Sequence, residues 1–301
     1  MRNKTLYFLM LIFGFTTVIS CSSDDDNGSS TKNLTLNLTG LEDLGSGYVY
    51  ESWLILESGP VSVGTFSVNA SGVLSKTSFS VNANTLSNAL AYVLTIEPNS
   101  DPNTAPSSVH ILAGDFTNNA TSATVSTNHQ SALGTDFTGA TGKYFLASPT
   151  DGTDNTNEKS GVWWVQFPTP MMPAPGLTLP ALPATGWKYE GWAVIGTTPV
   201  STGKFTSVTG ADDFSGFSGS APAPSVPGED FLMAAPAGLT FPTDLSGQKV
   251  VISVEPDPDN SPNPFLLKPL VAMIPATAKE QTSLSMGNNA AASNPGGSVT
   301  R

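Results

Sequence analysis

The chain has 301 residues and a formal net charge of −12, and only 12% of its residues are charged, about half the usual fraction. A surface of this sign repels phosphate groups, and no run of Lys or Arg interleaved with aromatic residues offsets it, so the composition argues against nucleic-acid binding. Hydrophobic residues make up 39% of the chain. This is ample apolar surface to bury, which argues against a wholly disordered protein.

The amino-terminal residues form a predicted secretion signal. Arg2 and Lys4 precede an apolar run over residues 6–19, which is shorter than the roughly 20 residues that span a bilayer. The run ends in Val-Ile-Ser-Cys and resembles the lipobox of bacterial lipoproteins. We therefore expect residues 1–20 to be a lipoprotein signal peptide and Cys21 to carry the lipid that attaches the chain to the outer membrane.

Residues 21–32 are predicted to form the lipidated end and a flexible acidic tether. The tether begins with a segment that resembles the export signal of Bacteroidetes-type lipoproteins: Ser22, Ser23, Asp24, Asp25 and Asp26. This resemblance implies display on the cell surface, and the periplasmic face is the alternative. Cys21 is the only cysteine, which excludes an intrachain disulfide and a metal site built from cysteines.

An internal repeat is the most informative feature of the remaining chain. Three segments of the first half recur in order in the second half: residues 50–53, 61–66 and 92–98 match residues 189–192, 200–205 and 250–256. The third match lies farther along in the second copy, because a Pro- and Gly-rich stretch near residues 222–242 is inserted before it. The repeat predicts two modules of the same structure.

The local pattern within each copy is that of short β-strands. In residues 34–38, Leu alternates with polar residues as in a half-buried strand, and residues 91–96 form a continuous apolar run. No stretch of a dozen residues has a helical period. We predict an all-β chain of two tandem antiparallel β-sandwiches of immunoglobulin-like shape. The expected modules are residues 33–155 and 156–301, the second with a proline-rich stretch at 168–183.

The repeated segments resemble the extracytoplasmic C-terminal domain of anti-sigma-K factors. In that family a Trp-containing strand is followed by a Pro and a Gly-x-Phe segment, and then by a strand that ends in Glu-Pro. Glu97-Pro98 and Glu255-Pro256 stand at the last position, although the Gly-Gly that follows in the family is absent here. The resemblance implies a sandwich outside the membrane. It does not imply sigma-factor binding, because the helical domain that performs it is missing.

Few residues of the sequence form a pattern typical of a catalytic or metal-binding site. Neither His110 nor His129 has a second His or Cys at metal-ligand spacing, and we expect no metal, cofactor or catalytic residue. Glu97 and Glu255 occupy equivalent positions, and we expect each to accept backbone N–H groups where its strand ends. The alternative is a pair of glycosidase carboxylates. Residues 257–260, Asp-Pro-Asp-Asn, are expected to form a solvated turn rather than part of a calcium site.

Two adjacent tryptophans are the candidate binding residues. Trp163 and Trp164 lie on one predicted strand and therefore point to opposite faces. One is expected in the core, and the other stacks on a sugar or covers an interface. Trp53 and Trp192, which recur in both copies, are expected in the core.

These observations predict a membrane-anchored, extracytoplasmic, non-catalytic lipoprotein whose tandem sandwiches bind a protein or glycan partner. A periplasmic accessory of an anti-sigma signalling system is one alternative. A glycan-handling enzyme with a carboxylate site is the other.

Overall fold

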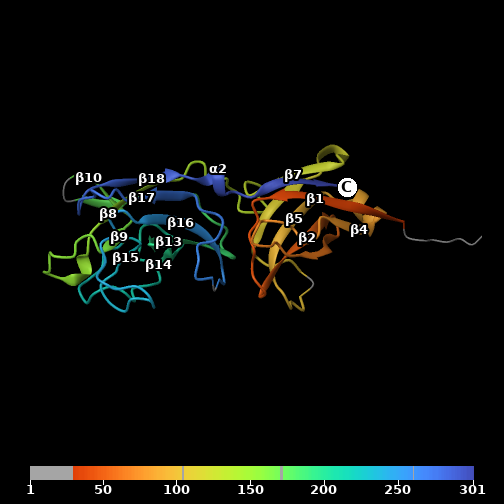
Figure 1. Ribbon diagram of the computed structural model, residues 1–301. Coiled ribbons are helices and arrows are strands. Elements are labelled where there is room, and N and C mark those ends of the chain that lie inside the picture. The colour runs from red at the N-terminus through yellow and green to blue at the C-terminus, as the bar shows by residue number, and fades with distance from the viewer. Residues whose placement is uncertain (1–29, 104, 170–171, 260) are drawn as a thin grey trace, which may run out of the picture.

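The computed structural model describes residues 30–103, 105–169, 172–259 and 261–301. It is elongated and belongs to the all-β class, with two large antiparallel sheets that follow one another along its length (Figure 1). The predicted all-β class with two antiparallel units is therefore confirmed. Within the described residues, no helix is long and apolar enough to cross a membrane.

The first sheet has eight strands in the order β3-β2-β5-β6-β7-β19-β1-β4, and the short helix α1 (Ala83–Ser87) follows β4. The strands are β1 (Thr31–Thr39), β2 (Tyr48–Leu56), β3 (Gly59–Phe66), β4 (Ser78–Asn82), β5 (Ala91–Pro98), β6 (His110–Asp115), β7 (Ser122–Ser126) and β19 (Gly296–Thr300).

The second sheet has the order β14-β13-β16-β17-β18-β8-β9-β15, and β12 (Leu177–Thr178) pairs with β8 beside this path. A separate hairpin is formed by β10 (Val165–Thr169) and β11 (Met172–Pro175), and helix α2 (Ala290–Ser293) precedes β19. The remaining strands are β8 (Thr141–Leu146), β9 (Gly161–Trp163), β13 (Trp187–Ile195), β14 (Thr198–Phe205), β15 (Gly228–Asp230), β16 (Lys249–Pro256), β17 (Leu270–Met273) and β18 (Leu284–Asn288).

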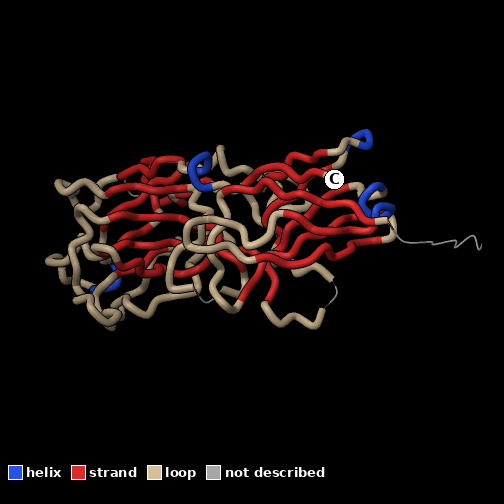
Figure 2. Tube along the Cα trace, turned by 45° about the vertical axis from the view of Figure 1, so that its right-hand side comes forward, coloured by secondary structure: helices blue, strands red, loops and turns tan. Residues whose placement is uncertain are grey.

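The sheet membership of the strands differs from the predicted division at residue 155. Strand β8 precedes that position but pairs with β18 and β9 in the second sheet. Strand β19 comes from the end of the chain but lies between β1 and β7 in the first sheet. The tube in Figure 2 shows strands along both halves, with loops at the end opposite to the start of the described chain and also between the halves.

The repeated segments have the same structure in both copies. In the first copy β2 lies between β3 and β5, and in the second β13 lies between β14 and β16. The β2–β3 register shifts between Ser52 and Trp53, and the β13–β14 register shifts at the equivalent Gly191 and Trp192. A stacked aromatic pair joins the two strands in each copy, with ring centroids 5.4 Å apart in the first and 5.8 Å apart in the second.

Alternating Leu residues of β1 provide one wall of the core. Leu34, Leu36 and Leu38 are 0%, 3% and 6% exposed, as the period-2 pattern predicts. The loop between β7 and β8 packs on the second sheet, where the rings of Phe137 and Tyr189 meet edge to face with their centroids 6.5 Å apart. Most of the buried hydrophobic residues of both units form one continuous cluster, and two small clusters lie outside it.

We predict that the first sheet depends on the last strand of the chain. Truncation after residue 294 removes β19, leaves the facing edges of β1 and β7 unpaired, and removes the buried Val299. The free energy of unfolding should fall by at least about 3 kcal/mol. Urea titration followed by tryptophan fluorescence measures this loss, because Trp53 is the tryptophan of the first sheet.

Arg301→Ala is the control for the truncation. It keeps β19 and removes the hydrogen bonds from the guanidinium to backbone oxygens, such as that of Ala89, and the contact of the guanidinium with the Phe116 ring. Its effect should be smaller. A truncated chain as stable as the wild type would contradict the role of β19.

Candidate functional site

An apolar pocket of about 620 Å³ lies where β8, β9 and the β10–β11 hairpin meet. In Figure 1 this region is at the end of the molecule farthest from the start of β1. Gln281 supplies the one long polar side chain of the lining, and every other lining residue is apolar. The lining consists of Phe145, Ala147, Pro149, Trp163, Val165, Phe167, Pro173, Pro224 and Gln281.

Aromatic side chains form one wall of the pocket. The rings of Phe145 and Phe167 meet edge to face, with their centroids 4.9 Å apart. Phe145, Trp163, Val165 and Val226 form a small hydrophobic cluster of their own, outside the main core. Phe167 is 44% exposed, so the pocket presents an aromatic ring to solvent at its rim.

Trp163 is held in place by a buried carboxylate. Its indole N–H donates to Asp230 Oδ1 at 2.7 Å, and Asp230 Oδ2 accepts the N–H of Thr150 at 2.8 Å and also the hydroxyl of Thr150. Gly228 has a φ of 149° and lies against the ring, where a Cβ would be 2.7 Å from Cε3 of Trp163. The ring therefore has a fixed orientation, with its polar edge occupied and only 3% of its surface exposed.

Trp164 belongs to the main core rather than to the pocket. It is fully buried and meets Tyr144 edge to face, with the ring centroids 6.1 Å apart. The two tryptophans thus join different clusters, which confirms that they point to opposite faces. Neither is an exposed platform, and Trp163 is the one that lines the pocket. A role of either residue in binding stays a prediction.

Carboxyl groups behind the pocket are desolvated. Burial raises the pKa of Glu229 to about 7, although the hydroxyl of Ser218 and the N–H of Asp230 donate to its Oε1 and act in the opposite direction. Burial also raises the pKa of Asp212 to about 7, and the N–H groups of Gly228 and Phe214 oppose this shift. Glu229 lies on β15 next to Asp230, and Asp212 lies in the loop before β15 and accepts the N–H of Gly228.

Glu97 stabilises the end of β5 through a short polar network. The indole N–H of Trp53 donates to Thr95 Oγ1 at 2.9 Å, and the hydroxyl of Thr95 donates to Glu97 Oε1 at 2.5 Å. The same carboxylate oxygen accepts the N–H of Ser107 at 2.8 Å. The prediction that Glu97 accepts a backbone N–H at the strand end is confirmed.

The second copy repeats this network at β16. The indole N–H of Trp192 donates to Ser253 Oγ at 2.7 Å, and the hydroxyl of Ser253 donates to Glu255 Oε1. The N–H of Phe265 donates to the same oxygen at 2.9 Å, which confirms the prediction for Glu255. The two glutamates lie in separate sheets, and each is bonded to its own loop.

Trp53 and Trp192 are buried, as predicted, with 1% and 2% of their surfaces exposed. We did not predict their hydroxyl partners from the sequence. The available signal is the placement of Thr95 and Ser253 two residues before each Glu, which puts both side chains on one face of the strand.

The predicted lipidation site and export signal, Cys21 and residues 22–26, lie outside the described residues. Comparisons with protein-family models, curated proteins and solved structures find no match. The resemblance to anti-sigma-K factors therefore stays a prediction, and the site is argued from its own geometry.

We predict that stability falls as the pH rises from about 5 to about 8. The pKa of Glu229 is raised from 4.5 to about 7 on folding, so the folded chain binds the proton more tightly. The stabilisation from this group is fully present below pH 4.5 and is lost as the pH rises through 7. Between about pH 5 and pH 8, the free energy of unfolding should fall by about 2 kcal/mol less in Glu229→Gln than in the wild type.

Urea titrations at several pH values measure the effect, with Glu57→Gln as the control because Glu57 is exposed in the β2–β3 turn. Equal pH dependence in the wild type and Glu229→Gln would show that Glu229 does not titrate in this way.

Proposed function

We propose that this chain is a lipid-anchored, extracytoplasmic lipoprotein that binds an apolar segment of a protein partner in the pocket beside Trp163 and Phe167. The apolar pocket is the observation that supports this proposal. It combines a preformed apolar lining with an exposed aromatic rim, and such concave apolar surfaces are the usual sites of ligand binding.

The chemistry of the lining favours a protein segment over a glycan. A sugar presents hydroxyl groups around its ring and needs several polar partners beside an aromatic face. Gln281 is the one long polar side chain of the lining, and the indole N–H of Trp163 is already bonded to Asp230. An apolar or proline-containing peptide needs fewer polar partners and fills such a pocket better.

The position of the pocket fits a chain anchored at its amino end. The described chain begins at one end of the elongated molecule, and the β10–β11 hairpin lies at the other (Figure 1). Met172 on this hairpin is 66% exposed and extends the apolar surface around the rim. A lipid on Cys21 would leave this end directed away from the membrane.

Selection from a displayed peptide library on the immobilised chain tests the binding proposal. We expect peptides rich in Leu, Phe or Pro, whose affinity falls about tenfold or more for Phe167→Asp because a charge enters the apolar rim. Val73→Asp is the control, since Val73 is 59% exposed and lies in the first unit. Fluorescence polarisation measures the affinities. Retention of glycans by the same surface, or peptide binding unchanged in Phe167→Asp, would contradict the proposal.

Protease treatment of intact cells tests the anchoring and its direction. We expect the wild type to be shaved from the surface, and an Asp24/Asp25/Asp26→Ala variant to be protected because its export signal is gone. Cys21→Ala should abolish metabolic labelling with a fatty acid. Protection of the wild type would place the protein on the periplasmic side and would favour the signalling alternative.

A further inference from the structure

Three carboxylates converge at the junction of β13 and β16, away from the apolar pocket. Glu190 lies on β13, Glu255 lies on β16, and Asp259 lies in the loop that follows. One oxygen atom of each lies within 4.8 Å of the others, and no other group of this kind occurs among the described residues. Oxygen ligands at 2.3–2.6 Å from one Ca²⁺ ion are at most roughly 5 Å apart, so these three carboxylates are close enough to share an ion.

The two glutamates are buried, and each has one oxygen that accepts no hydrogen bond. Glu190 is 4% exposed and Glu255 is fully buried. Their Oε1 atoms are occupied: Glu190 accepts the hydroxyl of Ser201, and Glu255 accepts the hydroxyl of Ser253 and the N–H of Phe265. Both Oε2 atoms are buried and accept no hydrogen bond within the described chain. Each carboxylate is thus oriented by one oxygen and leaves the other available as a ligand.

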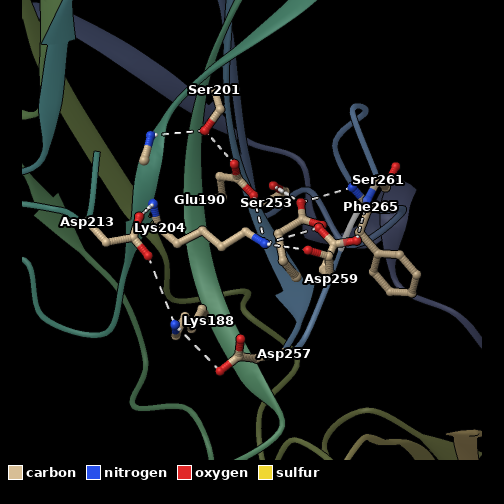
Figure 3. A network of polar contacts seen from close by, with 12 residues as sticks. Lys188, Glu190, Ser201, Lys204, Asp213, Ser253, Asp257, Asp259, Ser261 and Phe265 are labelled. Atoms are coloured by element: carbon tan, nitrogen blue, oxygen red, sulfur yellow. Dashed lines mark hydrogen bonds and ion pairs between the residues drawn. The ribbon is translucent and has the colours of Figure 1, made fainter. Parts of the chain in front are cut away.

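Among the described residues, Lys204 is the cationic side chain in contact with these carboxylates. Its Nζ lies 3.2 Å from Asp259 Oδ2, 3.9 Å from Glu190 Oε2 and 3.3 Å from the backbone oxygen of Asp259 (Figure 3). These contacts are longer than the 2.7–2.9 Å of a strong charged hydrogen bond. When all three acids are ionised, the ammonium of Lys204 balances one of the three negative charges, and Lys268 also interacts electrostatically with Glu255. The lysine stem can rotate away without moving the backbone.

The first copy provides an internal comparison. Glu51, Glu97 and Asp101 stand at the equivalent positions, and Thr65 stands in place of Lys204. Among the described residues, the carboxylate oxygens of Glu51, Glu97 and Asp101 do not come close enough together to form a comparable group. The convergence of three acids is therefore specific to the second copy.

We propose that Glu190, Glu255 and Asp259 bind Ca²⁺ in exchange for the ammonium of Lys204. The backbone oxygen of Asp259 adds a fourth oxygen of the chain, and water completes the coordination. An all-oxygen set suits a hard cation rather than zinc, and its irregular arrangement suits Ca²⁺ better than the strictly octahedral Mg²⁺. Our sequence-based interpretation of this loop as a solvated turn is wrong for Asp259, whose side chain is only 12% exposed.

An ion here would act on the junction between the two units. Asp259 also lines a cleft of about 450 Å³ together with Pro256 at the end of β16, Pro258 from its own loop, and Glu42 and Tyr48 from the first unit. Bound Ca²⁺ would join this loop to β13 and so fix one wall of the cleft.

Calorimetric titration of CaCl₂ into the chelator-treated full-length mature protein tests the proposal. We expect one site, with affinity at least roughly tenfold weaker in Asp259→Asn because a ligand is lost. Asp101→Asn, the matched change in the first copy, should leave the affinity unchanged. Lys204→Thr installs the residue of the first copy and should strengthen binding roughly tenfold, because the competing charge is gone. MgCl₂ should bind more weakly than CaCl₂.

Circular dichroism shows which variants are folded, and the wild-type titration stands even where a variant is not. Absence of Ca²⁺ binding by the wild type would overturn the proposal. So would binding that survives Asp259→Asn, or that is lost equally in Asp101→Asn.

Discussion

The pairing of the last strand with the first is the constraint on which the architecture depends. Strand β19 lies between β1 and β7 and is bonded to both over five residues each. Without it the first sheet would be two smaller sheets with two additional open edges, which are sites of aggregation in β proteins. The chain must therefore pass through the whole second unit before the first unit is complete. The main hydrophobic cluster contains residues of both units.

The two copies share one hydrogen-bond network but differ in the charged residues around it. In each copy a tryptophan N–H, a hydroxyl and a glutamate connect the central strand to the neighbouring strand, β5 or β16, and to the loop after that neighbouring strand. This network satisfies buried polar groups that would be costly if unpaired. The copies differ in the surrounding charges, since the second has Lys204 where the first has Thr65. The scaffold is thus kept while the electrostatic environment of its glutamate changes.

The sequence allowed the local structure to be predicted, but not the long-range pairing. Alternation in residues 34–38 and the repeated strand motifs depend on neighbouring residues, and these predictions agree with the structure. The roles of Glu97 and Glu255 followed from their position at strand ends. The place of β19 could not be predicted in this way, because pairing partners such as Leu36 and Val299 lie at opposite ends of the chain.

The candidate site was predictable only in part, for the same reason. The opposite orientations of Trp163 and Trp164 follow from strand geometry alone. The burial of Trp163 depends on Asp230, which is 67 residues away, and no local pattern relates the two. The convergence of Glu190, Glu255 and Asp259 likewise requires the pairing of β13 with β16 and the fold of the following loop.

The placement of β1 also has a mechanical consequence. In a chain tethered at its amino end, a pull on the far end would load β1 along its own axis, because this strand follows the length of the molecule (Figure 1). Strand β1 is bonded to β4 on one side and to β19 on the other. A load along the strand shears these two ladders together, whereas a load across it would open them one bond at a time. The fold therefore resists force best along the line from the start of β1 to the β10–β11 hairpin.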